Sequence, residues 1–147
     1  MAGVPEILLA DLSGQSHSLD LARLQRVADR ALPEAWKLQR EESVLASLRE
    51  IEISLVDDPT IARVHGEFMD LPEATDVITF HHGEILISVD TAREQAVDYG
   101  RSLGDEVALY VIHGLLHLAG FKDKCPEDFD LMATTQESLL SLCLKET

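Results

Sequence analysis

The chain has 147 residues and a formal net charge of −15, from 27 acidic and 12 basic side chains. Its length is that of one ordinary domain, and 46% hydrophobic and 27% charged residues are typical of a globular protein rather than a disordered chain or a membrane protein. Because cationic groups bind nucleic-acid phosphates, the acidic balance argues against a large nonspecific nucleic-acid surface but is compatible with a small local basic cleft.

The N-terminal segment predicts one strand and two helices. Residues 6–12 (EILLADL) form a short apolar run that ends at Ser13-Gly14, which is typical of a strand. Ser18 is the expected N-cap of a helix whose apolar residues recur at helical spacing as far as Pro33. Beyond this proline, a second short helix is expected over residues 34–39.

The middle of the chain predicts three more strands. Residues 49–56 (REIEISLV) alternate between apolar and polar side chains, which indicates a half-buried strand. An aspartate cap followed by a proline then predicts a helix over residues 59–69. Residues 76–80 (DVITF) and 84–89 (EILISV) are strand-like, and the short connection between them indicates a hairpin.

The C-terminal part predicts three helices. Asp90 or Thr91 is the expected cap of the first, which reaches Gly100. A long apolar helix is expected over residues 103–118, with Gly120 at a left-handed C-cap position. The final helix begins at Pro126 and has an apolar face formed by Phe129, Met132, Leu139, Leu140 and Cys143.

Together these elements predict an α/β (mixed α+β) fold. We expect residues 1–147 to form one domain, with a mixed sheet of about four strands and helices packed on it. The longest apolar stretch, Val107 to Phe121, is too short to span a bilayer, and the N-terminus lacks the basic region of a secretory signal. The two cysteines cannot form a disulfide framework. We therefore expect a cytoplasmic protein with no membrane partner.

The segment VIHGLLHLAGFKDK, residues 111–124, contains the strongest functional signal. On a helix, His113 and His117 lie one turn apart on the same face, with Cβ atoms roughly 5–6 Å apart. Two imidazoles at this distance can bind one cation, as in many zinc sites. An unsatisfied imidazole on so apolar a helix would cost roughly 1–3 kcal/mol, so a metal or specific hydrogen bonds must compensate.

The spacing after the histidine pair supplies a third candidate ligand. Gly120 and Asp123 complete the pattern H-x-x-x-H-x-x-G-x-x-D, which is the metzincin spacing with aspartate in the third position. Three protein ligands leave one coordination position open, which is typical of a catalytic zinc site. The sequence therefore predicts a Zn²⁺ site formed by His113, His117 and Asp123, with the two histidines also in the catalytic role. The competing interpretation of Asp123 is an ordinary turn residue that binds no metal.

One feature of the motif argues against a peptidase. In HExxH enzymes, the glutamate after the first histidine is the general base, whereas this chain has Gly114 at that position. No other side chain in the motif replaces that base.

The same residues resemble the signature of the YbeY endoribonuclease family, H-G-x-L-H-L-x-G-Y-D-H. Residues 113–121 (HGLLHLAGF) match it with phenylalanine for tyrosine. Residues 75–80 (TDVITF) and 84–88 (EILIS) resemble two further family blocks in the same order, and Met132 lies where the family often has a methionine. Together the matching blocks cover residues 75–132.

The resemblance implies an α/β fold with a zinc-like cation on three ligands. It also implies a single-strand-specific endoribonuclease that acts on ribosomal RNA, matures the 3′ end of small-subunit rRNA and takes part in ribosome quality control. The small ribosomal subunit is thus an expected partner. A cation can polarise a phosphoryl oxygen and activate water, so the missing glutamate matters less for RNA than for peptide cleavage.

The chain departs from the family pattern at two places. Asp123 replaces an imidazole ligand, and Met69 stands where the family has an arginine. Phosphate or substrate contacts are therefore expected from other residues. The candidates are Lys122, Lys124, Arg63, His65 and His81.

Two alternatives remain open at the level of the sequence. One is another metallohydrolase, such as a peptidase, on the same His-His-Asp site. The other is a noncatalytic ribosome-associated factor in which the metal only stabilises the fold. For each candidate substrate contact, an ordinary solvated surface residue is the competing interpretation.

Overall fold

The computed structural model describes residues 3–69 and 75–145. The strands are β1 (Glu6–Asp11), β2 (Glu50–Val56), β3 (Val77–Phe80) and β4 (Glu84–Ser88). The helices are α1 (Leu21–Lys37), α2 (Asp58–Met69), α3 (Val89–Tyr99), α4 (Leu103–Leu118) and α5 (Pro126–Lys145), with a 3₁₀ turn at Leu45–Ser47. The predicted order of strands and helices is confirmed except for the separate helix expected over residues 34–39.

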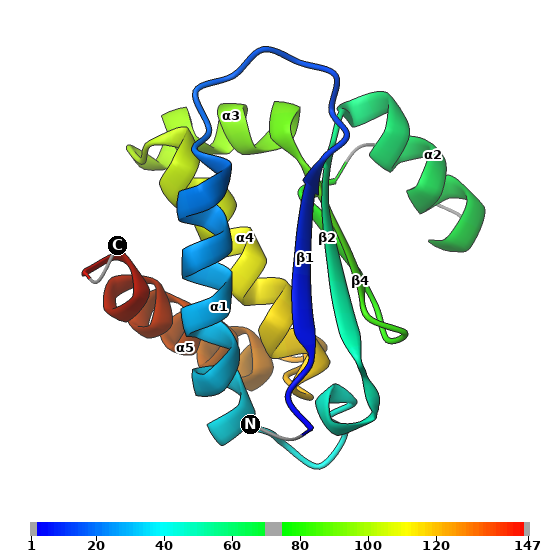
Figure 1. Cartoon of the computed structure of the whole chain (residues 1–147), viewed down its shortest axis with the longest axis vertical. Coiled ribbons are helices and arrows are strands. Elements are labelled where there is room, and N and C mark those ends of the chain that lie inside the picture. Colours follow the sequence, from blue (N-terminus) through cyan, green and yellow to red (C-terminus); the bar gives the residue numbers. More distant parts are fainter. Residues whose placement is uncertain (1–2, 70–74, 146–147) are drawn as a thin grey trace.

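The strands form one mixed sheet in the order β1-β2-β4-β3. β1, β2 and β4 run parallel, and β3 pairs antiparallel with β4 through the predicted hairpin. In Figure 1, α1, α4 and α5 lie on one side of the sheet and α2 lies on the other. The fold class is therefore the mixed α/β arrangement that the sequence predicts.

Each face of the sheet has its own apolar cluster because side chains alternate along a strand. Ile51, Ile53 and Leu55 of β2 are fully buried in the main core, where they pack with α1, α4 and α5. A smaller cluster on the opposite face joins Val56, Ile61, Ile78 and Leu86, with Ile61 contributed by α2. The main core therefore lies between the sheet and the helices α1, α4 and α5, and the smaller cluster lies between the sheet and α2.

The prediction that a helix ends at Pro33 is wrong. α1 continues from Leu21 to Lys37 with this proline inside it, so residues 34–37 belong to the same helix. Leu32 and Ala35 beside it are buried in the main core, and this burial offsets the backbone hydrogen bond that proline removes. Asp20, not Ser18, is the N-cap, and its side chain accepts a hydrogen bond from the Arg23 backbone N–H.

Two further local predictions need correction. Ser88, not Asp90 or Thr91, caps α3, since its hydroxyl accepts from the Thr91 backbone N–H. Phe129 is 56% exposed, so it lies off the buried face of α5 that contains Met132, Leu139, Leu140 and Cys143.

Within the described ranges, no helix is both long enough and apolar enough to cross a bilayer.

Candidate metal centre

His113 and His117 lie in the last two turns of α4, and both are half-buried. Their Nε2 atoms are 3.0 Å apart. Two ligands that bind one tetrahedral zinc through bonds of about 2.0–2.1 Å have their nitrogens ~3.3 Å apart. The helix therefore brings two imidazole nitrogens to nearly the separation that one shared cation requires.

The opposite ring nitrogen of each histidine is held by an oxygen. Nδ1 of His113 lies 2.8 Å from Oε1 of Gln136, and Nδ1 of His117 lies 3.0 Å from the backbone carbonyl oxygen of Phe121. Because these oxygens only accept, each Nδ1 carries the proton and donates it. Both Nε2 atoms then present lone pairs toward each other, an arrangement that a shared cation stabilises.

Asp123 supplies an oxygen to the same point. Its Oδ2 lies 3.5 Å from Nε2 of His117, and one ligand atom from each of the three residues lies within 4.8 Å of the others. The Asp123 side chain is 51% exposed, so a small loop movement can shorten its distance to a cation. Two imidazoles and a carboxylate are an acceptable zinc donor set with a fourth position open to solvent, and the residues present fit a divalent cation.

Gly120 determines the path of the loop that follows α4 and contains Asp123. The N–H of Gly120 donates to the carbonyl of His117 and the N–H of Phe121 to that of Leu116, which is a Schellman motif. The φ of Gly120 is +97°, and a Cβ there would lie 2.9 Å from the backbone nitrogen of Ser43. The turn therefore needs glycine for both its conformation and its close packing, and it directs the chain back toward the histidines.

The electrostatics of His117 favour metal binding. Burial, and then the neighbouring His113, lower the pKa of His117 below its ordinary value, and this effect outweighs the opposing Asp123 carboxylate. A neutral imidazole is the form that binds a cation. His117 is therefore in its ligand form at neutral pH.

Gly114 faces the sheet. A Cβ at this position would lie 2.7 Å from Cδ1 of Ile85 on β4. The missing side chain thus allows close packing of α4 on β4. A glutamate here would meet the buried sheet, so the position cannot provide the general base of an HExxH peptidase.

A hollow of about 390 Å³, which we call the metal hollow, contains all three candidate ligands. His65 and His81 line it as well, as do residues 75–79 at the start of β3. The structure therefore brings two of the predicted substrate contacts to the candidate metal centre, although they are distant in sequence.

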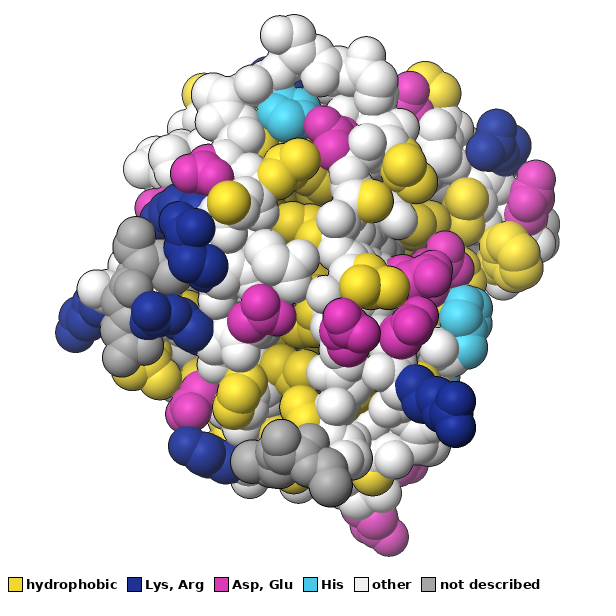
Figure 2. Space-filling view, viewed as in Figure 1, with side chains coloured by type: hydrophobic (Ala, Val, Ile, Leu, Met, Phe, Trp, Pro, Cys, Tyr) yellow, Lys and Arg dark blue, Asp and Glu magenta, His cyan; other side chains and the backbone are white. Residues whose placement is uncertain are grey.

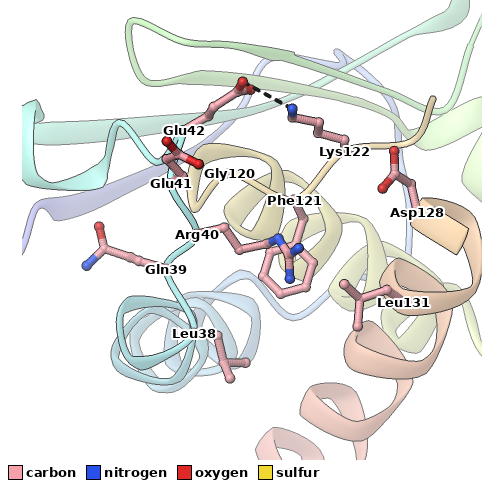
Figure 3. Close-up of a pocket in the computed structure, with 10 residues that line it drawn as sticks. All are labelled: Leu38, Gln39, Arg40, Glu41, Glu42, Gly120, Phe121, Lys122, Asp128 and Leu131. Atoms are coloured by element: carbon pink, nitrogen blue, oxygen red, sulfur yellow. Dashed lines mark ion pairs between the residues drawn. The ribbon is translucent and has the colours of Figure 1, made fainter. Parts of the chain in front are cut away.

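A second hollow of about 240 Å³, the lysine hollow, contains Lys122 and Lys124 together with His81, His117 and Asp123. Lys122 also forms an ion pair with Glu42 at 3.1 Å, at the border of a third hollow of about 480 Å³ (Figure 3). Both partners of this pair are exposed, so it contributes little energy and leaves Lys122 available to another anion.

Figure 3 also shows the Arg40 guanidinium over the ring of Phe121, 5.4 Å from its centroid. On the face in Figure 2, acidic and basic side chains are interspersed with exposed apolar ones. Near the candidate centre, the cationic side chains Lys122 and Lys124 line the lysine hollow, which is compatible with the acidic composition.

Arg63 is the predicted contact that the structure does not bring to the centre. It is exposed on α2 and lines neither the metal hollow nor the lysine hollow. The side chain of Met69, at the position of the family arginine, lies outside the described part of the structure.

The sequence interpretation missed Gln136 and Asp76. Gln136 holds His113, and Asp76 lines the metal hollow. A signal for Gln136 was present, because it is a polar residue at helical spacing between Met132 and Leu140 on the apolar face of α5. Asp76 belongs to the family-like block of residues 75–80, but that block was interpreted as a strand and not as part of the site.

Comparison with known proteins supports the resemblance on which the site was predicted. Residues 11–143 match the sequence profile of the family described as Endoribonuclease YbeY. Relatives named Endoribonuclease YbeY include one from Myxococcus xanthus, 40% identical over 62% of this chain, and one from Heliobacterium modesticaldum, 35% identical over 66%. Another, from Symbiobacterium thermophilum, is 33% identical over 82% of the chain.

These matches cover the relatives to different extents. The aligned region is 35% of the Myxococcus protein, so the chain spans about a third of that relative, but it is 76% and 85% of the other two. A Thermotoga maritima protein solved in solution has a TM-score of 0.59 over 95% of this chain and 90% of its own, at 24% identity, which concerns the fold alone. Since the profile covers most of the sequence, the chain belongs to the YbeY endoribonuclease family.

Proposed function

We propose that this protein is a metal-dependent endoribonuclease specific for single-stranded RNA. It matures the 3′ end of small-subunit ribosomal RNA and contributes to ribosome quality control in the cytoplasm. The observation that carries the proposal is the convergence of two Nε2 atoms, 3.0 Å apart, with the Asp123 carboxylate in an open hollow. The reaction is that named for the family and for its relatives, an endoribonuclease.

The proposed cation is Zn²⁺, held by His113, His117 and Asp123. When bound, it supplies electrophilic stabilisation of a phosphoryl oxygen and lowers the pKa of water at the site. Gln136 and the Phe121 carbonyl keep the two imidazoles oriented. The donor set alone does not distinguish Zn²⁺ from other divalent ions, so metal analysis of the purified protein is the first measurement.

The remaining side chains of the hollows have roles that fit RNA cleavage. His65 and His81 place two further imidazoles in the metal hollow, where one can transfer a proton near neutral pH. Lys122 and Lys124 border Asp123 and can contact a phosphate of the bound strand. Arg63 is not among the proposed contacts, because it lines neither the metal hollow nor the lysine hollow.

The peptidase alternative is not favoured. It needs a base next to the metal, and the position that supplies it in HExxH enzymes packs against Ile85. The noncatalytic alternative would explain the ligands but not the imidazoles of His65 and His81, which share the open hollow with them.

The test compares single-stranded RNA, duplex RNA and a fluorogenic peptide, each with added zinc or with a chelator. We expect cleavage of single-stranded RNA alone, lost with the chelator and in His113→Ala, which also loses the metal. His82→Ala is the matched control, because His82 is exposed and pairs with Glu84 outside the metal hollow. Uncut RNA at saturating enzyme and zinc, together with a cut peptide, would contradict the proposal.

The ribosomal role has a separate test in cells. Replacement of the native gene by the His113→Ala form is expected to leave small-subunit rRNA with an unprocessed 3′ end, seen by mapping the ends of the RNA. Normal rRNA in cells that contain this metal-free variant would favour the noncatalytic alternative.

A further inference from the structure

A further hollow lies on the other side of His113. It measures about 400 Å³, and we call it the side hollow. It shares Asp76, Val77 and His113 with the metal hollow, so the two cavities are adjacent. Gln136 lines the side hollow and also holds Nδ1 of His113. A molecule in this cavity would therefore lie directly beside the candidate metal ligands.

The side hollow contains a buried acceptor beside a donor. Glu106 is only 2% exposed, and its Oε1 accepts no hydrogen bond from the described residues. Nε of Arg101 is 3.4 Å away and forms an ion pair with this oxygen, but within the described ranges neither atom makes a hydrogen bond. At 3.4 Å this ion pair is long for a hydrogen bond, so a ligand that supplies one hydrogen-bond partner to each atom would gain binding energy here.

The rim of the side hollow carries an aromatic ring. Tyr99, at the end of α3, is 71% exposed and lines the cavity. Leu109 and Val77 form an apolar part of the cavity wall. Tyr110 also lines the cavity, and its hydroxyl donates a hydrogen bond of 2.6 Å to Oε1 of Gln95. An exposed aromatic over an apolar wall is a surface on which a flat ring can stack.

The charges of the side hollow exclude phosphate as its occupant. Three carboxylates line it, from Asp76, Glu106 and Glu137, against the single guanidinium of Arg101. Glu137 binds that guanidinium through Nη2 at 2.9 Å. A phosphate would be repelled, whereas a neutral ring with an N–H next to an acceptor would complement Glu106 and Arg101.

We propose that the side hollow binds one nucleobase of the RNA, that of a nucleotide next to the cleaved bond. The base stacks on Tyr99, and its Watson–Crick edge pairs with Oε1 of Glu106 and Nε of Arg101 after a small movement of these side chains. This inference rests on the proposed function, since it assumes an RNA strand in the metal hollow. It adds a subsite that reads the base, separate from contacts to phosphate.

The stacking part is tested on the zinc-loaded protein by fluorescence anisotropy with a labelled, uncleavable single-stranded 2′-O-methyl RNA. We expect Tyr99→Ala to weaken binding roughly tenfold, within the range of base–aromatic stacking, and Tyr99→Phe to retain it. Val97→Ala is the matched control, because Val97 is 78% exposed on the same helix and does not line the side hollow. In cleavage assays, Tyr99→Ala should raise KM and leave kcat and metal affinity unchanged.

The base-edge part uses the same RNA with its bases methylated on the Watson–Crick edge. Wild-type protein should bind the methylated strand several-fold more weakly, and Glu106→Gln should reduce this discrimination. Glu94→Gln, at an exposed position of α3 outside the side hollow, should behave as wild type. Because Glu106 is buried, thermal unfolding first checks that Glu106→Gln is folded. If Glu106→Gln does not fold, the surface variant Tyr99→Ala still tests the proposal.

The outcomes separate the two proposals. If wild-type protein cleaves RNA while Tyr99→Ala binds and cleaves like Val97→Ala and edge methylation has no effect, the nucleobase subsite is wrong and the ribonuclease proposal stands. If wild-type protein cleaves no RNA, the proposed function fails, whatever the binding assay shows. RNA binding that falls equally in Tyr99→Ala and Val97→Ala would also overturn the subsite.

Discussion

At the scale of single residues, the candidate metal centre depends on groups that never touch the metal. Gln136 and the Phe121 carbonyl each accept the Nδ1 proton of one imidazole and so direct its Nε2 toward the same point. A helix alone fixes the separation of two histidines but not their tautomers or ring rotations. The partner from α5 therefore turns a histidine pair on a helix into a preorganised pair of ligands.

Replacement of Gln136 by leucine removes the hydrogen bond to His113 and leaves the three candidate ligands in place. Loss of such a partner typically lowers metal affinity by 10–100-fold, so we expect a decrease of about that size. Competition with a chromophoric chelator measures it. The control is Ser138→Ala, an exposed position on the same helix. Equal zinc affinity in wild type and Gln136→Leu would show that His113 needs no such partner.

At the scale of elements, the packing of α4 on β4 positions the centre. The two histidines line the metal hollow, and the adjacent side of the helix lies against the sheet, where a Cβ at Gly114 would meet Ile85. The glycine that fits the family signature thus has a packing role that spacing alone does not reveal. Gly114 therefore acts through the packing of α4 on β4 rather than through the chemistry of the metal centre.

Gly114→Ala should therefore destabilise the fold. Its Cβ would lie 2.7 Å from Cδ1 of the fully buried Ile85, an overpacking that costs about 1–3 kcal/mol, against a gain of up to about 1 kcal/mol in helix propensity. Urea denaturation measures the net loss in the free energy of unfolding. Ile85→Val removes that Cδ1 atom, so the double variant should recover part of the loss.

Gly104→Ala is the internal control for this prediction. Gly104 lies on the same helix, and its added Cβ would meet only the mobile end of Arg23 at 3.3 Å. We expect an unchanged or slightly higher stability, because the helix gains propensity without overpacking. Similar losses at both glycines would mean that the contact with Ile85 is not the cause.

Elements were predictable from the sequence where the signal is local and strongly periodic. The alternation of residues 49–56 and the apolar run of residues 103–118 identify β2 and α4 because burial itself produces those patterns. The continuation of α1 through Pro33 was not predictable, since tertiary burial of the neighbouring residues outweighs the local cost of the proline. The caps at Asp20 and Ser88 were missed because several adjacent polar residues are equally good caps by type.

The part of the candidate centre that is local in the sequence was predictable, as the strongly periodic elements were. His113, His117 and Asp123 share one helix and its turn, so their proximity follows from local spacing. Gln136 and Asp76 come from other elements, and their approach depends on how α5 and β3 pack around α4. Such long-range contacts leave only weak traces in one sequence, such as a glutamine on an apolar helix face.

At the scale of the whole molecule, a metal bound only by the folded protein must add to its stability. The gain is RT ln(1 + [L]/Kd), or about 2.7 kcal/mol at a free metal concentration of 100 times Kd. The candidate ligands join the end of α4 to the loop that follows, and Gln136 connects them to α5. Removal of the metal should therefore lower the free energy of unfolding of the entire domain.

This gain should disappear in acid, and the sign follows from His117. Its pKa in the folded protein is below the ordinary value of about 6.5, so the unfolded chain takes up the proton first as the pH falls. Between these two pKa values, the chelated protein should lose stability as the pH decreases. Metal binding weakens as well, because protons compete with the cation for the imidazoles.

Urea unfolding at a series of pH values, with zinc or with a chelator, measures both effects. We expect the zinc-loaded protein to be the more stable at pH 7, by an amount that follows the zinc concentration, and the two curves to converge below about pH 6.5 as His117 protonates. The low pKa of His117 extends metal binding to a lower pH than an ordinary histidine would allow, so convergence should be complete only well below that value. A difference that persists unchanged in acid would place the stabilising metal on groups other than these histidines.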